Sequence, residues 1–327
     1  MRKRDNIYKY GSAVEWSLPV LFNAEHIWTA IYRQLKEHDI TPPKVYTYGC
    51  PACNWAGGRL PNQQSVNIKA LDKIFNYLHE CNATPTFTFT YTGLTKEDLN
   101  DWYCNALLDF ALEHNSNFIV YSDLLKDYIK NKSSNARITS SLIKASVRFQ
   151  GENRIEEPTA ENETNFYNKL LKEYDVVVVR PEYSKYVLSE HPEYIDDLSR
   201  IEVLINQICL RNCPLSHEHY KAFEKYRLGN QPNGAVFDCI MDNFTIDDYE
   251  NENLILLHSY SKVSKLVKAG IKHLKLQGRG DAAPIEELLF LFYTQMFNTE
   301  GDSYRVILNL LSSLHREVNY FNQLVST

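Results

Sequence analysis

The sequence predicts an α/β fold in which eight short parallel strands alternate with helices. Short apolar runs recur along the chain, and most are followed by a segment whose apolar residues have helical spacing. One run, DVVVVR, is apolar at four successive positions, as in strands covered on both faces. The chain has 327 residues, which is enough for one large closed barrel. Together these observations predict a TIM-like (β/α)8 barrel.

The predicted strands lie between predicted helices along most of the chain. They occupy residues 45–49, 83–90, 117–122, 137–142, 175–180, 201–205, 254–258 and 273–277. The predicted helices occupy residues 24–38, 66–81, 95–115, a short stretch from 123, a stretch ending near 174, 261–269, 284–297 and 302–324. Residues 150–164 are polar and lack a periodic apolar run, so we expect a loop there.

Turn and capping residues set several of these boundaries. Pro42 and Pro43 end the first helix, and Pro181 ends the apolar strand. Thr95 followed by Asp98 is typical of a helix start. We therefore expect four parts. They are an N-terminal helical entry segment (1–44), a barrel (45–300), an insertion after the sixth strand (221–253) and a C-terminal helix (301–327).

Composition restricts the class of protein. The net charge is −6, so binding to nucleic acid through a broad basic face is not favoured. No apolar stretch is long enough to span a bilayer, and no apolar region follows the basic N-terminus as it would in a secretory signal. Seven unevenly spaced cysteines argue against a disulfide framework and for a reducing compartment, so we expect a cytoplasmic protein.

Two cysteines directly after the sixth predicted strand are the main functional signal. Cys209 and Cys213 are three residues apart, Pro214 follows, and His217 and His219 come next. A strand that leads into closely spaced cysteines and a proline is typical of a metal or cluster site. The alternative is that these cysteines are small buried hydrophobic residues.

The barrel geometry would gather further residues near this pair. In such barrels the carboxyl ends of the strands carry the chemistry. Cys50 and Cys53 follow the first predicted strand, Cys239 lies in the insertion and Arg279 follows the eighth strand. We therefore expect five of the seven cysteines at one mouth. The other two, Cys81 and Cys104, occupy apolar helix positions and are expected in the core.

Four segments carry a family resemblance. They are the loop VYTYGCPACNWAGGR, the strand IEVLINQ, the turn ICLRNCP with His219, and GIKHLKLQGR. Together they resemble peptidase family U32, the collagenase-like peptidases, over about residues 45–297. Ser216 stands where relatives carry a basic residue.

The resemblance implies a barrel that holds a 4Fe-4S cluster on four cysteines. By this resemblance Cys209 and Cys213 match the paired ligands, Cys239 matches a later ligand, and Cys50 or Cys53 is the fourth. Zinc is the alternative cofactor, because four thiolates also form a common structural zinc site.

Three classes of function remain open. The resemblance implies an iron–sulfur-dependent, oxygen-independent hydroxylase or related oxidoreductase. It also implies, as alternatives, a peptidase or a non-catalytic subunit that carries a cluster for a similar barrel in a hetero-oligomer. No Ser-His-Asp signature or HExxH stretch is visible, so a hydrolase has no recognisable nucleophile. We expect a small-molecule or protein substrate and no nucleic acid.

Four polar residues are further candidates for the site. Lys275, Arg279 and His219 are predicted catalytic groups, and Arg59 and Arg279 are predicted to bind substrate. Lys275 is expected to point into the barrel lumen, because its neighbours in the strand are leucines that would face the helices. The alternatives are that the arginines only fix their loops and that His219 is a solvated loop residue.

Overall fold

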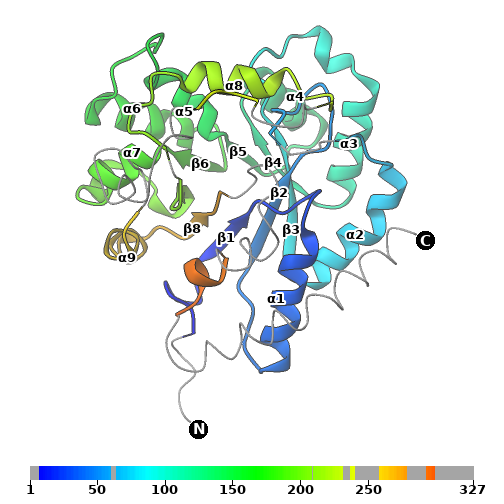
Figure 1. Cartoon of the computed structure of the whole chain (residues 1–327), viewed down its shortest axis with the longest axis horizontal. Coiled ribbons are helices and arrows are strands. Elements are labelled where there is room, and N and C mark those ends of the chain that lie inside the picture. The colour runs from blue at the N-terminus through cyan, green and yellow to red at the C-terminus, as the bar shows by residue number, and fades with distance from the viewer. Residues whose placement is uncertain are drawn as a thin grey trace.

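The computed structural model describes residues 7–59, 64–207, 209–230, 236–239, 258–277 and 292–298. Eight parallel strands close into a barrel in chain order, which confirms the predicted fold class (Figure 1). The strands are Glu15–Leu18 (β1), Val45–Gly49 (β2), Ala83–Phe89 (β3), Asn117–Val120 (β4), Ile138–Ser140 (β5), Val176–Val179 (β6), Ile201–Leu204 (β7) and His273–Lys275 (β8).

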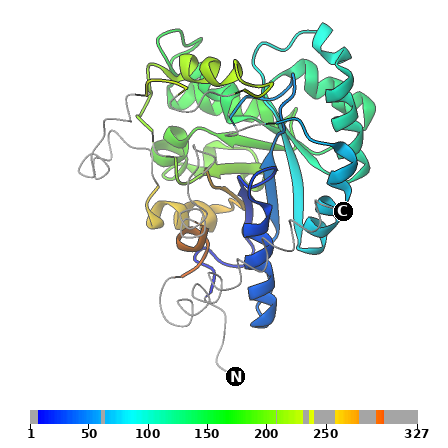
Figure 2. The same ribbon diagram turned by 45° about the vertical axis from the view of Figure 1, so that its right-hand side comes forward.

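Helices surround the barrel, and one of them, α8, crosses above its upper end (Figures 1 and 2). The α-helices are Glu25–Glu37 (α1), Ile68–Glu80 (α2), Trp102–Glu113 (α3), Asp123–Lys132 (α4), Leu142–Phe149 (α5), Ala160–Leu171 (α6), Pro181–Tyr183 (α7), Ser216–Glu224 (α8) and Tyr260–Ala269 (α9). Shorter turns are Glu97–Asn100 (η1), Ser184–Leu188 (η2), Pro192–Tyr194 (η3) and Leu198–Arg200 (η4). No helix in the described ranges is both long and apolar enough to span a membrane.

The main apolar core lies between the strands and the surrounding helices. Successive strand side chains point to opposite faces of the sheet. Trp16 and Leu18 of β1 and Val177 and Val179 of β6 are buried in this core. Their strand neighbours point into the lumen, as Ser17 does where it bonds to Glu202. The apolar face of each strand therefore packs against helices and leaves the lumen free for polar groups.

The lower lumen is polar and almost filled. Glu15 accepts a hydrogen bond from the Tyr46 hydroxyl (2.8 Å) and lies 3.2 Å from Nδ1 of His273. Arg137 donates to the Tyr46 hydroxyl in turn (2.8 Å). The hydrogen bond from His273 holds the pKa of Glu15 at about 2, and Tyr46 and Lys44 act in the same direction against the effect of burial. Only about 20 Å³ of space remains among the side chains at this level.

The prediction that residues 1–44 form a separate entry segment is wrong, because this region contributes β1 and α1 to the barrel. Glu15–Leu18 pairs in parallel with both β2 and β8. The predicted helix at 24–38 is confirmed as α1. The strand was missed because it is four residues long and alternates polar and apolar residues, which is a weak signal in so short a run.

No strand separates β7 from β8 in the barrel, where the prediction placed one at 254–258. β7 pairs directly with β8, from Glu202 opposite His273 to Leu204 opposite Lys275, so no strand lies between them. Residues 254–257 lie outside the described ranges, and the backbone N–H of His258 bonds to the Ile205 carbonyl (3.1 Å). β1 was missed, and the strands predicted as first to sixth are β2 to β7.

Smaller differences concern helix ends. Asp98 accepts bonds from Thr95, as predicted, but this caps the turn η1. The helix α3 begins after Asp101, whose carboxylate accepts from the Cys104 N–H (2.8 Å). The helix α5 follows β5 where no helix was predicted, and α8 takes up the start of the predicted insertion at 221–253. Residues 292–296 are helical, as predicted, and 301–327 lie outside the described ranges.

Beyond the ends of β7 and β8, a side chain continues their pairing. The Asn206 amide donates to the Gln277 carbonyl (2.7 Å), and its oxygen accepts from the Gln277 N–H (2.7 Å). These are the two bonds that a main-chain partner would make at this rung. The Asn206–Gln277 clasp therefore holds the two strands together where their chains diverge.

Candidate active site

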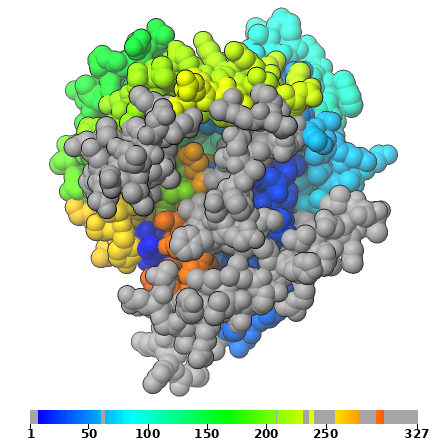
Figure 3. Space-filling model, in the orientation of Figure 1, coloured from blue at the N-terminus to red at the C-terminus, as the bar shows by residue number. Residues whose placement is uncertain are grey.

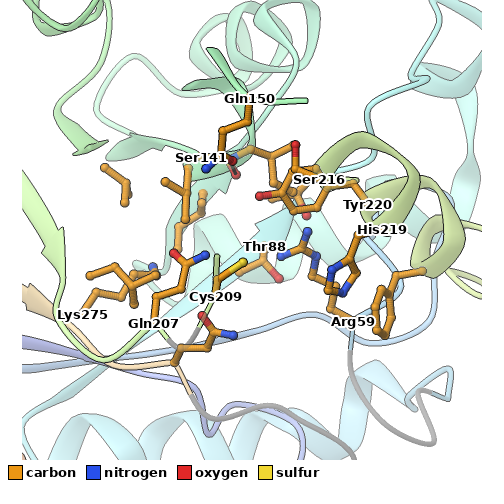
Figure 4. Close-up of a pocket in the computed structure, with 18 of the residues that line it drawn as sticks. Arg59, Thr88, Ser141, Gln150, Gln207, Cys209, Ser216, His219, Tyr220 and Lys275 are labelled. Atoms are coloured by element: carbon orange, nitrogen blue, oxygen red, sulfur yellow. Dashed lines mark hydrogen bonds between the residues drawn. The ribbon is translucent and has the colours of Figure 1, made fainter. Parts of the chain in front are cut away.

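A cavity of about 340 Å³ opens at the carboxyl ends of the barrel strands, above the filled lower lumen (Figure 4). Its floor and walls are inward-pointing residues at or just past the strand ends. These are Tyr48, Thr88, Thr90, Ile119, Ser141, Val178, Leu204, Lys275 and Gln277. This is the end of such barrels at which active sites are built, and the volume is that of a small-molecule site.

The polarity of the residues that line the cavity differs from strand to strand around the barrel. Val178 and Leu204, from β6 and β7, present apolar side chains, and Ile119 of β4 continues the same side. On the other side Lys275 of β8 and Thr88 of β3 present polar groups. Ser141 after β5, Gln150 after α5 and Gln207 after β7 also line the cavity, so polar groups reach both sides of it.

The helix α8 covers the cavity from above. His219, Tyr220 and Phe223 of this helix line the cavity. In the space-filling view α8 lies in a continuous yellow-green band across the top of the molecule, between the green α5–α6 side and the cyan α3–α4 side (Figure 3). The helix begins three residues after Cys213, so the segment that contains Cys209 and Cys213 leads directly into α8.

Three cysteines line this cavity, and they are Cys209, Cys213 and Cys239. The Cys209 thiol donates a hydrogen bond to the Cys213 sulfur, which lowers the pKa of Cys213 to about 7 and raises that of Cys209. The Leu215 N–H also bonds to the Cys213 sulfur and lowers its pKa further. Cys239 is close enough for its charge to raise the pKa of Cys209. The structure therefore places these three residues at one cavity.

A buried network of charged residues fixes the turn between Cys209 and Cys213, which we call the cysteine turn. Arg180, which is completely buried, donates to the Asn212 side-chain oxygen (2.7 Å) and lies 3.2 Å from Glu182. Glu182 accepts from the Asn212 backbone N–H (3.0 Å) and from Gln150 (2.6 Å). Asn212 itself has a positive φ of 51° and sits between the two cysteines in sequence. Its backbone and its side chain are thus fixed by two charged residues that follow β6.

Glu163 of α6 completes this network. It lies 3.5 Å from Arg180 and accepts a bond from the Tyr167 hydroxyl (3.2 Å). Burial raises the pKa of Glu163 to about 7, although the Arg180 charge opposes the shift. The Arg180–Glu182–Glu163 network was not predicted from the sequence. Its signal was a pair of charged residues directly after the apolar strand, in VVVVRPE, where chemistry is often placed.

Lys275 points into the lumen, as predicted. Its ammonium lies 3.1 Å from Glu202 Oε2 and 3.9 Å from the centre of the Tyr48 ring. Leu274 and Leu276 are buried in the core outside the barrel. Burial opposes ionisation of Glu202, but the Lys275 charge and the Ser17 hydroxyl lower its pKa overall. Lys275 and Glu202 therefore form a buried ion pair.

Arg59 also lines the cavity, as predicted. Its guanidinium lies 4.2 Å above the Tyr220 ring, which fixes the plane of the group. The preceding residue, Gly58, has a φ of +70°, and a side chain there would collide with the Phe223 carbonyl. The loop after β2 therefore passes directly beneath α8 and delivers Arg59 to the cavity.

His219 is the histidine of the cavity. Its ring stacks on Phe237 at a centroid distance of 4.9 Å and lies 5.1 Å from the Phe223 ring. It is therefore packed among aromatic rings, and the alternative that it is a solvated loop residue is wrong. His217 points elsewhere, with Nε2 2.9 Å from the Val147 carbonyl. Arg279, predicted for both catalysis and substrate binding, lies outside the described residues.

Cys50 and Cys53 do not line the cavity, contrary to the prediction that one of them completes the ligand set. Their sulfurs are 3.7 Å apart, and Cys53 also bonds to the Cys104 thiol. All three are buried in the core, and burial raises the pKa of Cys53 well above its usual value. The loop CPACNW packs against α3 through the Cys53–Cys104 contact, and its Trp55 packs on the Phe89 ring of β3. Cys81 and Cys104 are buried, as predicted.

The cavity therefore supplies three thiols and not four. In the part of the chain that is described, no three His, Cys, Asp or Glu side chains are grouped closely enough to hold a metal ion. A single ion needs its ligands to converge on one point, whereas each cysteine of an iron–sulfur cluster binds its own iron. The three thiols of the cavity are one short of the four-thiolate set of structural zinc sites.

No family model matches this chain, and no curated protein matches it. Among solved structures, the U32 peptidase Mk0906 is similar over 82% of this chain and 93% of its own, with 12% identity and a TM-score of 0.47. The structure of AsfvAP:AG is similar over 80% of this chain and 87% of its own, with 10% identity and a TM-score of 0.42.

Proposed function

We propose that this protein is an iron–sulfur-dependent oxidoreductase that hydroxylates a small molecule in the barrel-mouth cavity without molecular oxygen. The observation that supports this proposal is the position of Cys209, Cys213 and Cys239. Cys209 and Cys213 come from the turn after β7 and Cys239 from the later segment 236–239, and all three line one cavity at the carboxyl ends of the strands. Thiolates are the ligands of choice for iron–sulfur clusters, and a cluster beside a substrate cavity is placed for redox chemistry.

The atoms and electrons of the proposed hydroxylation can be balanced. Conversion of a C–H bond to C–OH with water as the oxygen source releases two electrons and two protons, so an external electron acceptor is required. When bound, a cluster on these three cysteines would supply one-electron transfer to that acceptor. His219 lines the cavity and has the side chain that most readily exchanges protons near neutral pH. Lys275 lines the cavity and is held in place by its ion pair with Glu202.

The network of Arg180, Glu182 and Asn212 positions the cysteines. Its bonds fix the turn between Cys209 and Cys213 before any cofactor binds. A site whose ligands are held in place loses less entropy on binding. All seven cysteines are free thiols, which agrees with a reducing compartment such as the cytoplasm.

The structure offers less support for a peptidase. Ser184 Oγ lies 2.8 Å from Nε2 of His258, which is the kind of contact that a serine nucleophile needs. Both residues are buried, and neither lines the cavity. The Ser184 hydroxyl also donates to the Pro181 carbonyl (3.1 Å), so the contact serves to fix the start of η2.

Anaerobic purification of the full chain tests the proposal. We expect brown protein with bound iron and sulfide and an absorption band near ~400 nm that bleaches on reduction. Cys209→Ser, Cys213→Ser and Cys239→Ser should each lose most of the iron. Cys81→Ala is the matched control, because Cys81 is buried away from the cavity.

Two other outcomes would change the assignment. Colourless protein with stoichiometric zinc would replace the cluster by a zinc site. Loss of iron in Cys50→Ser or Cys53→Ser would show that the loop after β2 supplies a fourth ligand. Protein that binds neither metal, with Cys209→Ser and the unchanged chain indistinguishable, would overturn the proposal.

A further inference from the structure

We propose that Cys50 and Cys53 form a second redox site, a dithiol that a small peroxide oxidises to a disulfide and whose oxidation alters the packing of α8. This inference goes beyond the proposed function and does not depend on it, because neither cysteine lines the cavity. It rests on the position of the two sulfurs, on a third thiol beside them and on the contacts between their loop and α8.

The two sulfurs are placed for a disulfide. Cys50 directly follows β2, and two residues separate it from Cys53. Their sulfurs are 3.7 Å apart, and a disulfide requires them to approach to about 2.0 Å. The segment joins β2 to α2 in a unit whose two strands, β2 and β3, are parallel. A C-x-x-C pair in such a strand–helix–strand unit is typical of thiol redox sites.

A third thiol contacts this pair. Cys104 of α3 hydrogen-bonds to Cys53, and all three cysteines are buried. Three neighbouring thiols would also be the start of a metal site. Within the described ranges, however, no three such side chains are grouped closely enough to hold an ion. A redox role therefore fits these thiols better than a metal, and the C-x-x-C spacing assigns Cys50 as the partner of Cys53.

The oxidation balances with hydrogen peroxide as the oxidant. The Cys50 sulfur attacks one peroxide oxygen and the O–O bond breaks, which gives a sulfenic acid and one water molecule. The Cys53 sulfur then attacks the Cys50 sulfur, the S–O bond breaks, and the hydroxide leaves with the Cys53 proton as a second water. Burial raises the pKa of Cys53, so we assign the first step to Cys50.

Burial also selects the kind of oxidant. Cys50 and Cys53 are each 2% exposed, so a large disulfide reaches their sulfurs only after the loop opens locally. Hydrogen peroxide is little larger than water and needs a much smaller opening. The site is therefore suited to a small peroxide rather than to direct exchange with another protein.

The loop that carries the pair also contacts α8. The Cys53 N–H donates to the carbonyl of Arg227, just past the end of α8 (2.9 Å). Gly58, farther along the same loop, lies so close to the Phe223 carbonyl that a side chain there would collide with it. Closing the disulfide moves Cys53, so the bond to Arg227 has to adjust. The oxidation state of the pair should thus alter the packing of α8 over the cavity.

Peptide mapping of the full chain tests the pair directly. The protein is titrated with hydrogen peroxide, unfolded in iodoacetamide and cleaved with trypsin. Cleavage after Lys44 and Arg59 yields one peptide, 45–59, that contains Cys50 and Cys53 and no other cysteine. We expect this peptide to lose two hydrogen atoms and to take up no alkyl group, and we expect dithiothreitol to reverse the change.

The same digest separates the competing disulfide. Cys104 lies in the tryptic peptide 97–126, so a Cys53–Cys104 disulfide would join two peptides. Cys53→Ser should abolish closure of the peptide 45–59, and Cys104→Ala should leave closure unchanged. Cys81→Ala is the matched control, because it removes another buried thiol of the core and should also leave closure unchanged.

Hydrogen exchange measures the link to α8. We expect the backbone amides of α8 to exchange about twofold faster or more in the oxidised chain than in the reduced chain. The amides of α6, which does not contact this loop, should exchange equally in both. Peroxide should leave α8 exchange unchanged in Cys53→Ser, which separates the effect of this pair from oxidation of the cavity cysteines.

Several results would overturn the inference. They are a peptide 45–59 that stays fully alkylated, a disulfide between Cys53 and Cys104, iron bound through Cys50 or Cys53, and α8 exchange that does not respond to closure of the pair. The proposed function fails separately, because it depends on iron at the cavity cysteines. Protein that lacks iron but closes Cys50 and Cys53 reversibly would retain this inference and lose the proposed function.

Discussion

Lys275 and Glu202 form a buried ion pair on the neighbouring strands β8 and β7, with Nζ 3.1 Å from Oε2. Ser17 of β1 donates a hydrogen bond to the same carboxylate. Three adjacent strands are therefore tied together inside the lumen by polar contacts, at the level where the filled lower lumen gives way to the cavity. This arrangement makes the floor of the cavity part of the stability of the barrel.

Removing one partner of this pair should strongly destabilise the protein. Lys275→Met leaves Glu202 charged in a buried site, and we expect a loss of about 3 to 5 kcal/mol in the free energy of unfolding. Lys275→Met combined with Glu202→Leu should recover much of that loss, since no buried charge is then unpaired. Urea unfolding measures both. A single variant as stable as the unchanged chain would show that water reaches Glu202.

Gly58→Ala should displace α8 from the loop after β2. The added Cβ would collide with the Phe223 carbonyl, and the φ of +70° adds strain for any side chain. Gly11→Ala is the matched control, because it has a φ of +89° and nothing within 4 Å of its Cβ. We expect both variants to lose about 1 kcal/mol from backbone strain. Only Gly58→Ala should lose substantially more, measured by thermal unfolding. Equal losses would show that the helix moves freely to make room.

Asn212 should control the cysteine turn through two separable contributions. Asn212→Gly tolerates the positive φ but loses the side-chain bond to Arg180, whereas Asn212→Ala loses the bond and is also strained. We expect faster alkylation of Cys213 in both variants, measured with a thiol reagent on metal-free protein, and a larger effect for alanine. Alkylation rates equal to that of the unchanged chain would mean that Arg180 does not hold the turn.

Glu163 should make the folded state less stable as pH rises. Its pKa is about 7 in the folded protein and 4.5 as the ordinary value, so the folded state binds more protons between these limits. Stability therefore falls as pH rises from about 4.5 to about 7, by as much as about 3 kcal/mol from this group. Glu163→Gln should remove this slope, so that the variant gains relative to the unchanged chain at pH 8 compared with pH 5. Parallel pH profiles in urea unfolding would contradict the assignment.

The sequence was informative where a signal is local. The apolar run at β6 and the strand–helix alternation predicted the barrel, and the inward direction of Lys275 followed from the leucines on either side of it. Cys209, Cys213 and Cys239, three of the five cysteines expected at this mouth, line one cavity because loops at the carboxyl ends of barrel strands share one face. These successes depend on periodicity and topology, which a sequence carries directly.

The sequence did not predict which way loops pack or which residues contact one another across the fold. Cys50 and Cys53 lie on the correct loop, but this loop turns inward against α3, and spacing alone does not show which way a loop packs. The network around Arg180 joins residues from α6, the end of β6 and the cysteine turn, and such contacts appear only when the chain is folded. β1 was missed because a run of four residues shows too little periodicity. In the folded chain its pairing with β2 and β8 makes it a strand.

The Asn206–Gln277 clasp has a consequence for how this barrel tolerates change. Because a side chain completes the last rung between β7 and β8, the main chain can leave after Asn206 and return at His258 without breaking the ring of strands. The excursion between these two residues carries α8 and all three cavity cysteines. This stretch starts and ends beside the same pair of strands, so its length and sequence can change while the register between β7 and β8 stays the same.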